Sequence, residues 1–175
     1  ASQMTSSLVG AEMCIRDSSR IAAIWDQTIQ SGDPPEGFLY GTEYTKQQID
    51  EALESENPLV VVPSIDENGH GTFLAGIAAG SESEDGSFFG AAPKSMIAMV
   101  KLKPAKRYLR DFFFIKEGAE AYQENDIMMA VKYMRVASYL LGKPLVILLG
   151  LGTNLGSHEA TSPLCLVLQD ISRTL

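Results

Sequence analysis

The chain alternates short apolar runs with stretches of helical periodicity. Four runs have the length and composition of buried strands: residues 21–25, 59–62, 96–100 and 145–149. Between them, apolar residues recur at the spacing of an amphipathic helix, most clearly over residues 127–141. Buried strands that alternate with helices are typical of an α/β fold. We therefore predict a parallel sheet flanked by helices.

Capping residues mark two predicted helices in the first half of the chain. Thr45 is a favoured N-cap residue, and Gln48, three positions further on, completes the pattern of a capping box. This pair predicts a helix over residues 46–53. A second helix is predicted to begin at His70 and to end at Gly80, because glycine is the commonest residue just after a helix.

Two more helices are predicted in the second half. Asn125 or Asp126 is expected to cap the amphipathic stretch, and Gly142 is expected to end it. Ser162 is expected to cap a last helix that starts at Pro163, since proline is favoured in the first turn. We also expect the aromatic residues 112–114 to be covered by other parts of the protein.

Composition limits the possible partners. Apolar residues make up 45% of the 175 residues and charged residues 21%, with a net charge of −8. Nucleic acids and anionic membranes bind clustered Lys and Arg, so we expect neither as a partner. The basic stretch at residues 101–110 is interpreted as a solvated loop. No apolar run approaches the ~18 residues of a membrane span.

The N-terminal residues and the cysteines carry little information about function. Residues 1–18 show no usable periodicity, and part of this stretch looks like translated sequencing adapter, so we expect a non-native or disordered leader. The start of the chain has no secretion-signal pattern. Cys14 and Cys165 are too few for a disulfide framework or a metal cluster, which slightly favours the cytoplasm while leaving the compartment open.

Candidate chemistry centres on one histidine and one aspartate. His70 lies between Gly69 and Gly71 at the start of a helix of mainly small residues, and Asp26 ends the first apolar run. Serine hydroxyls become nucleophilic when a positioned base takes their proton, and imidazole, with a pKa of about 6.5, suits that task. A carboxylate beside the imidazole fixes its tautomer. The order Asp, then His, then a later Ser is that of the subtilisin triad.

Three ordered segments resemble the subtilisin-like (S8) serine peptidases, with Trp-Asp-Gln-Thr and Tyr-Gln-Glu-Asn-Asp segments most similar to those of clostridia and related anaerobes. The segments are His70-Gly71-Thr72-x-x-Ala75-Gly76, then Gly90-Ala91-Ala92-Pro93 followed by Ile97-x-x-Val100-Lys101, then the apolar run 145–149 leading into Gly150-Leu151-Gly152. The resemblance implies that residues 19–175 are part of a subtilisin-like domain, truncated before the segment that bears the serine.

The same resemblance implies roles for individual residues. Asp26 and His70 would be the acid and the base of the triad. Leu151 and Gly152 would contact the main chain of an extended peptide or protein substrate, as in strand addition. Residues 100–103 would form the other wall of the cleft. No cofactor is expected; calcium binding occurs in this family, but this sequence offers no assignable ligands.

Several residues depart from the family's pattern or compete with these assignments. The usual Asp-Thr-Gly or Asp-Ser-Gly is replaced by Asp26-Gln27-Thr28. Asp66 is a rival for Asp26 but is interpreted as a turn residue. Ser162 lacks the family's Gly-Thr-Ser context and is interpreted as a helix cap. Asn154 and His158 are interpreted as loop residues rather than as an oxyanion donor and a metal ligand.

Two functions remain open from the sequence. The first is a fragment of a serine endopeptidase that hydrolyses peptide bonds through an Asp-His-Ser triad, with the serine missing from the present chain, which would itself be inactive. The second is a non-catalytic pseudopeptidase with a peptide-binding or regulatory role, of the kind associated with germination. The sequence leaves substrate specificity and oligomeric state undetermined.

Overall fold

The structure is a computed structural model that describes residues 14–15, 18–83, 85–153 and 156–174. Most of the predicted leader and Asn154 lie outside the described residues. The chain divides into two compact units, residues 1–99 and 100–175. The boundary predicted between a leader at residues 1–18 and a peptidase domain at residues 19–175 stays a prediction. Among the described residues, no helix combines the length and the apolar character needed to cross a membrane.

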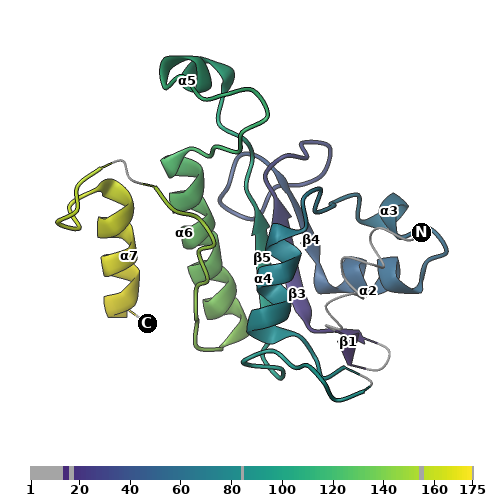
Figure 1. The fold of residues 1–175 in the computed structure, drawn as a ribbon. Coiled ribbons are helices and arrows are strands. Elements are labelled where there is room, and N and C mark those ends of the chain that lie inside the picture. The colour runs from purple at the N-terminus through teal and green to yellow at the C-terminus, as the bar shows by residue number, and fades with distance from the viewer. Residues whose placement is uncertain (1–13, 16–17, 84, 154–155, 175) are drawn as a thin grey trace. The chain divides into compact units, whose positions relative to one another are not determined.

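Unit 1 is built on a three-stranded sheet (Figure 1). Strand β3 (Ile21–Asp26) lies between β4 (Thr42–Thr45) and β5 (Ile97–Lys101), whose last two residues belong to unit 2. The predicted α/β fold is confirmed, but the sheet is mixed, because β3 and β4 are antiparallel. A turn cluster at residues 32–37 folds the chain back without the crossover helix that a parallel neighbour requires. β1 (Cys14–Ile15) and β2 (Ser18–Ser19) form a separate antiparallel pair.

Two helices follow β4. α2 (Lys46–Glu54) begins with the predicted capping box: the Thr45 hydroxyl accepts from the Gln48 amide, and the Gln48 side chain accepts from the Thr45 amide. α3 (Pro58–Val61) replaces the strand predicted at residues 59–62, and that prediction was wrong. Proline fixes the backbone angle that a first helical turn needs, and packing of this turn against α2 overrides the strand preference of the valines.

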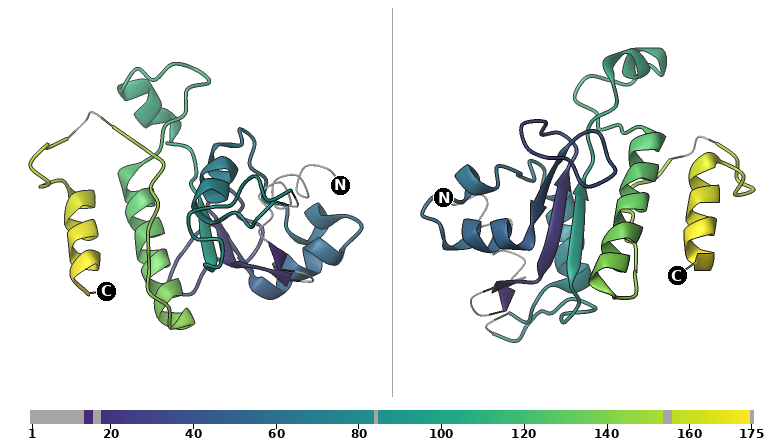
Figure 2. Two further views of the ribbon diagram at one scale, coloured as in Figure 1. Left: turned by 60° about the horizontal axis from the view of Figure 1, so that its bottom comes forward. Right: turned by 180° about the vertical axis from the view of Figure 1, so that it is seen from behind.

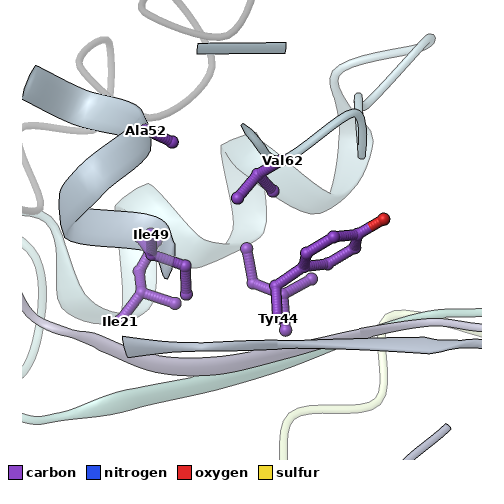
Figure 3. Close-up of a cluster of buried hydrophobic side chains, with 6 residues drawn as sticks. Ile21, Tyr44, Ile49, Ala52 and Val62 are labelled. Carbon is purple, nitrogen blue, oxygen red and sulfur yellow. The ribbon is translucent and has the colours of Figure 1, made fainter. Parts of the chain in front are cut away.

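The core of unit 1 lies between the sheet and these helices. Figure 3 shows side chains from β3, β4, α2 and the end of α3 converging on one another. The buried cluster consists of Ile21, Ile24, Tyr44, Ile49, Ala52 and Val62. Ala75 of the helix that follows is partly buried against the same cluster. Helices α2, α3 and α4 therefore share one face of the sheet.

Helix α4 (His70–Ala79) starts and ends at glycines. Gly69 is its N-cap residue with φ 78°, and the helix ends at Gly80, as predicted, although Gly80 has φ −56° and is not left-handed. Gly80 is needed for space instead, because a Cβ would lie 2.6 Å from the carbonyl oxygen of Gly76. The chain returns against this end through Gly90, where a Cβ would lie 2.4 Å from the Gly80 nitrogen.

A buried arginine secures the same end of α4. The guanidinium of Arg20 donates hydrogen bonds to the carbonyl oxygens of Ala79 and Ser95 and to the hydroxyl of Ser81. Arg20 is only 6% exposed. A cation at a helix C-terminus meets the negative end of the helix dipole. This residue therefore links the end of α4 to the start of β3.

Unit 2 contains α5 (Arg107–Phe112), α6 (Glu124–Leu141) and α7 (Pro163–Thr174). Helices α6 and α7 lie side by side (Figure 2). Gly142, at φ 60°, ends α6 as predicted. The predicted cap of α7 is also confirmed, since the Ser162 hydroxyl accepts from the amide of Cys165 at 3.3 Å.

The N-terminus of α6 differs from the prediction. Its N-cap residue is Gln123, not Asn125 or Asp126. Asp126 lies inside the first turn, buried, with a carboxylate oxygen 2.5 Å from the Lys103 ammonium. The interpretation of residues 101–110 as a solvated loop is therefore wrong for Lys103, and the same stretch contains part of α5.

Two apolar stretches of unit 2 are more exposed than predicted. Residues 145–149 form no strand, and Val146 is 94% exposed. A strand needs a hydrogen-bonded neighbour, and none is assigned beside this stretch in the described part of the chain. The aromatic residues at 112–114 are also exposed, with Phe114 at 92%, so the expected cover is absent from the described residues.

Candidate active site

Asp26 ends strand β3 and is completely buried. One carboxylate oxygen accepts hydrogen bonds from the Thr28 amide at 2.8 Å and the Thr28 hydroxyl at 2.5 Å. The other accepts from the Ser64 hydroxyl at 2.6 Å. A buried carboxylate is costly unless donors of this kind surround it. These three donors fix the orientation of the Asp26 side chain.

The negative charge of Asp26 affects Tyr44 on the neighbouring strand β4. Tyr44 pairs with Ile24 on β3, two residues before Asp26 and on the same face of the strand. Burial, and after it the negative charge of Asp26, raises the pKa of the Tyr44 hydroxyl above its ordinary value of 10.0. The Asp26 carboxylate therefore lies on the sheet face covered by the helices.

The departure from the family's Asp-Thr-Gly pattern has a local explanation. In this chain the hydroxyl comes two residues after the aspartate, from Thr28, and Gln27 lies between them, fully buried. The position of Thr28 lets its amide and its hydroxyl reach the same carboxylate oxygen in an Asx-type turn. No role was predicted for Thr28 from the sequence, although its hydroxyl, two residues after the end of a strand, was a usable signal.

Ser64 was also missed from the sequence. It follows Pro63, just after the strand predicted at residues 59–62, and its side chain had no expected partner. The structure instead carries the chain from buried Val62 past the end of β3, so that the Ser64 hydroxyl reaches Asp26. The segment that leads to α4 is thus tied to the carboxylate.

His70 is the first residue of α4 and is exposed. Its amide donates to the side-chain oxygen of Asn68 at 2.8 Å. The preceding Gly69 has φ 78°, in the left-handed region that favours glycine, so the turn before His70 depends on this residue. The imidazole therefore projects from a helix start whose backbone is set by side chains of the preceding loop.

Asp66, the rival of Asp26 in the sequence, serves a different purpose. Its carboxylate accepts from the Gly69 amide at 3.0 Å, the Thr72 amide at 2.8 Å and the Thr72 hydroxyl at 2.7 Å. Burial raises the pKa of Asp66, but these hydrogen bonds outweigh burial and hold the pKa below the ordinary 3.8. The interpretation of Asp66 as a turn residue agrees with this role as a cap of α4.

The predicted substrate-binding residues lie in the other unit. Leu151 and Gly152 are exposed, within a stretch that has no helix or strand. Their contacts with a peptide stay a prediction, as does the cleft wall at residues 100–103. His158 is exposed, as expected for a loop residue. Within the described ranges, no group of three or more His, Cys, Asp and Glu side chains is arranged to hold a metal ion.

The local geometry is that of a buried acid at the end of a strand and a histidine at the head of a glycine-bounded helix. Residues 36–143 match the model of the subtilase family, Peptidase S8. Because the match covers more than half of the chain, the protein belongs to the subtilase family. His70 lies inside the matched region, and Asp26 precedes it.

A solved structure supports the same assignment at the level of the fold. The protein is similar to the CspB protease of Clostridium perfringens, with a TM-score of 0.74 and 32% sequence identity. The alignment covers 93% of this chain and 30% of that one, so the chain spans less than a third of the length of the protease. No curated protein matches the chain.

Proposed function

We propose that this chain carries the acid and the base of a serine endopeptidase, with Asp26 orienting His70 and with the nucleophilic serine outside the 175 residues. The observation that carries this proposal is the buried Asp26 carboxylate, held by Thr28 and Ser64 at the end of β3. Ser64 precedes the His70 helix in the same segment. Membership of a peptidase family and the likeness to a named protease support the same chemistry.

In the proposed mechanism, His70 takes the proton of the serine hydroxyl as the serine attacks the scissile carbonyl carbon. The imidazolium then donates that proton to the leaving amine. Asp26 accepts a hydrogen bond from the imidazole, fixes its tautomer and stabilises its charged form. The donors from Thr28 and Ser64 keep the carboxylate from rotating away. Leu151 and Gly152 would hold the substrate as an added strand.

The test uses the protein encoded by the complete reading frame, treated with a fluorophosphonate probe. A single labelled serine within a Gly-Thr-Ser segment is expected. His70→Ala should abolish labelling, and Asp26→Asn should slow peptide hydrolysis by about 10⁴-fold, as in related triads. Residues 1–175 alone should neither label nor cleave. His158→Ala and Asp33→Asn, at exposed positions, are the matched controls.

Three results would reject the peptidase proposal. A stop codon directly after Leu175 would remove the expected nucleophile. Labelling that survives His70→Ala would exclude His70 as the base. A folded complete protein that does not react with the probe would favour the pseudopeptidase, which keeps the peptide-binding surface without the chemistry.

A further inference from the structure

The first turn of α4 lacks the usual means of stabilisation. Its N-cap residue, Gly69, has no side chain with which to accept a helical amide. Its apolar contacts are concentrated further along, since Ala79 is the buried residue of the helix and Ala75 packs on the core cluster. His70, Gly71 and Phe73 are exposed. Hydrogen bonds rather than packing therefore hold the turn that bears His70.

Those hydrogen bonds come from two loop side chains. The Asn68 side chain accepts from the His70 amide, and Asp66 accepts from the amides of Gly69 and Thr72. Asp66 thereby spans the turn, with one oxygen on the residue before His70 and the other on the residue two positions after it. The Thr72 hydroxyl adds a third hydrogen bond at 2.7 Å.

We propose that Asp66 is a positioning residue for His70, fixing the backbone on both sides of it and thereby the direction of the imidazole. This inference rests on the proposed function, in which His70 is the base. In that function Asp26 remains the acid, whereas Asp66 acts on the backbone of the turn through the amides of Gly69 and Thr72. Its negative charge at the helix N-terminus also offsets the positive end of the dipole.

We call the hydrogen bonds from Gly69 and Thr72 to the Asp66 carboxylate the Asp66 clamp. Substitutions at Thr72 test this clamp without changing charge. The amide and the hydroxyl of Thr72 converge on the same oxygen of Asp66. Thr72→Val keeps the shape of the side chain and removes the hydroxyl donor. Thr72→Ser keeps the donor and removes a methyl group. If the Thr72 hydroxyl positions the turn, Thr72→Val should disturb the position of His70. Thr72→Ser should leave that position as in the parent chain.

The experiment is nuclear magnetic resonance of the labelled 175-residue chain, which has only two histidines. His158 lies in the other unit and is an internal reference for the His70 imidazole resonances. Asp66→Asn is expected to move the His70 ring signals and to speed exchange of the Thr72 amide by about 10- to 100-fold, the loss expected for a hydrogen bond to a charged group. Glu67→Gln, at the next exposed position, controls for charge.

A loss of overall stability must be separated from a loss of positioning. Ile49→Val weakens the core that lies away from this turn and should leave the His70 ring signals unchanged. Thr72→Val should move them, and Thr72→Ser should leave them close to those of the parent chain. If Asp66→Asn does not fold, this valine and serine pair decides the question.

The inference is overturned if Asp66→Asn or Thr72→Val leaves the His70 signals and the Thr72 exchange as in the parent chain. It is equally overturned if Ile49→Val or Glu67→Gln moves them as much. Failure of the proposed function gives a different result, namely probe labelling that survives His70→Ala. In an active complete protein, Thr72→Val should lower kcat with KM little changed, and Thr72→Ser should restore kcat.

Discussion

The two units hold their predicted functional residues by different means. In unit 1, Asp26 lies at a strand end within a ring of donors, and His70 starts a helix clamped by Asp66. In unit 2, Leu151 and Gly152 lie on an exposed stretch without regular structure. Side chains of the neighbouring loops thus hold both the Asp26 carboxylate and the turn before His70 through hydrogen bonds.

The largest expected effect comes from breaking the core that supports unit 1. Ile49→Ala removes a fully buried side chain between β3 and α2 and should lower the free energy of unfolding by about 2–5 kcal/mol. Leu39→Ala, at a residue 96% exposed, should change it by less than about 0.5 kcal/mol. Urea titration of both variants checks this, and equal midpoints would refute the core assignment.

The partly buried ion pair between Lys103 and Asp126 in unit 2 offers the next largest effect. Lys103→Met leaves the Asp126 carboxylate buried without its cation and should cost about 3 kcal/mol. Adding Asp126→Leu should recover part of that loss, because two apolar side chains need no charge compensation. Thermal unfolding followed by circular dichroism tests the pair. A double variant no better than the single one would contradict it.

Ser64→Ala tests the donors around Asp26. It removes one hydrogen bond to a buried carboxylate and should lower the free energy of unfolding by about 1.5–3 kcal/mol. Ser172→Ala, on an exposed face of α7, is the control and should have little effect. Chemical denaturation compares the two. Equal stabilities would mean that Ser64 does not support the Asp26 position.

The Asp66 clamp should respond to pH in a defined direction. Because its folded pKa lies below the ordinary 3.8, Asp66 contributes stability that is complete above that value. The contribution is lost as pH falls through the lower folded pKa. Amide exchange at Thr72 should therefore stay protected at pH values just below 3.8 and lose protection in stronger acid. Asp66→Asn should abolish this pH dependence, and an unchanged profile would contradict it.

The smallest expected effect concerns Val146 and tests whether residues 145–149 of unit 2 form a buried strand. Val146→Ser should change stability by less than about 0.5 kcal/mol, since Val146 is 94% exposed. A buried strand at residues 145–149, as the sequence predicted, would instead give a loss of about 1.5–3 kcal/mol. Denaturant unfolding of this one variant distinguishes the two descriptions.

Local signals in the sequence were dependable where a side chain acts on its own backbone. The capping box at Thr45, the serine cap before Pro163 and the glycine at the end of α6 are confirmed. The predicted strand at residues 59–62 became a helical turn, because Pro58 and packing against α2 outweighed valine's preference. A short apolar run predicts burial poorly when the part of the protein that would cover it is unknown.

The same limit applies to the candidate site. Chain order and family motifs selected Asp26 and His70, whose roles stay predictions. They did not reveal Ser64, because its hydrogen bond to Asp26 joins residues 38 positions apart, which only the fold brings together. Asp66 was interpreted as a turn residue from its neighbours alone. Its contact with Thr72 became evident only when the first turn of α4 was in place.

The close return of the chain at Gly90 has a consequence for sequence variation. Even alanine there would drive its methyl group into the backbone at 2.4 Å, with no rotamer to relieve the overlap. Gly118 has open space around it and φ +77°, which asparagine tolerates. In a saturation library selected for folding, position 90 should therefore admit a single amino acid, while position 118 admits at least two.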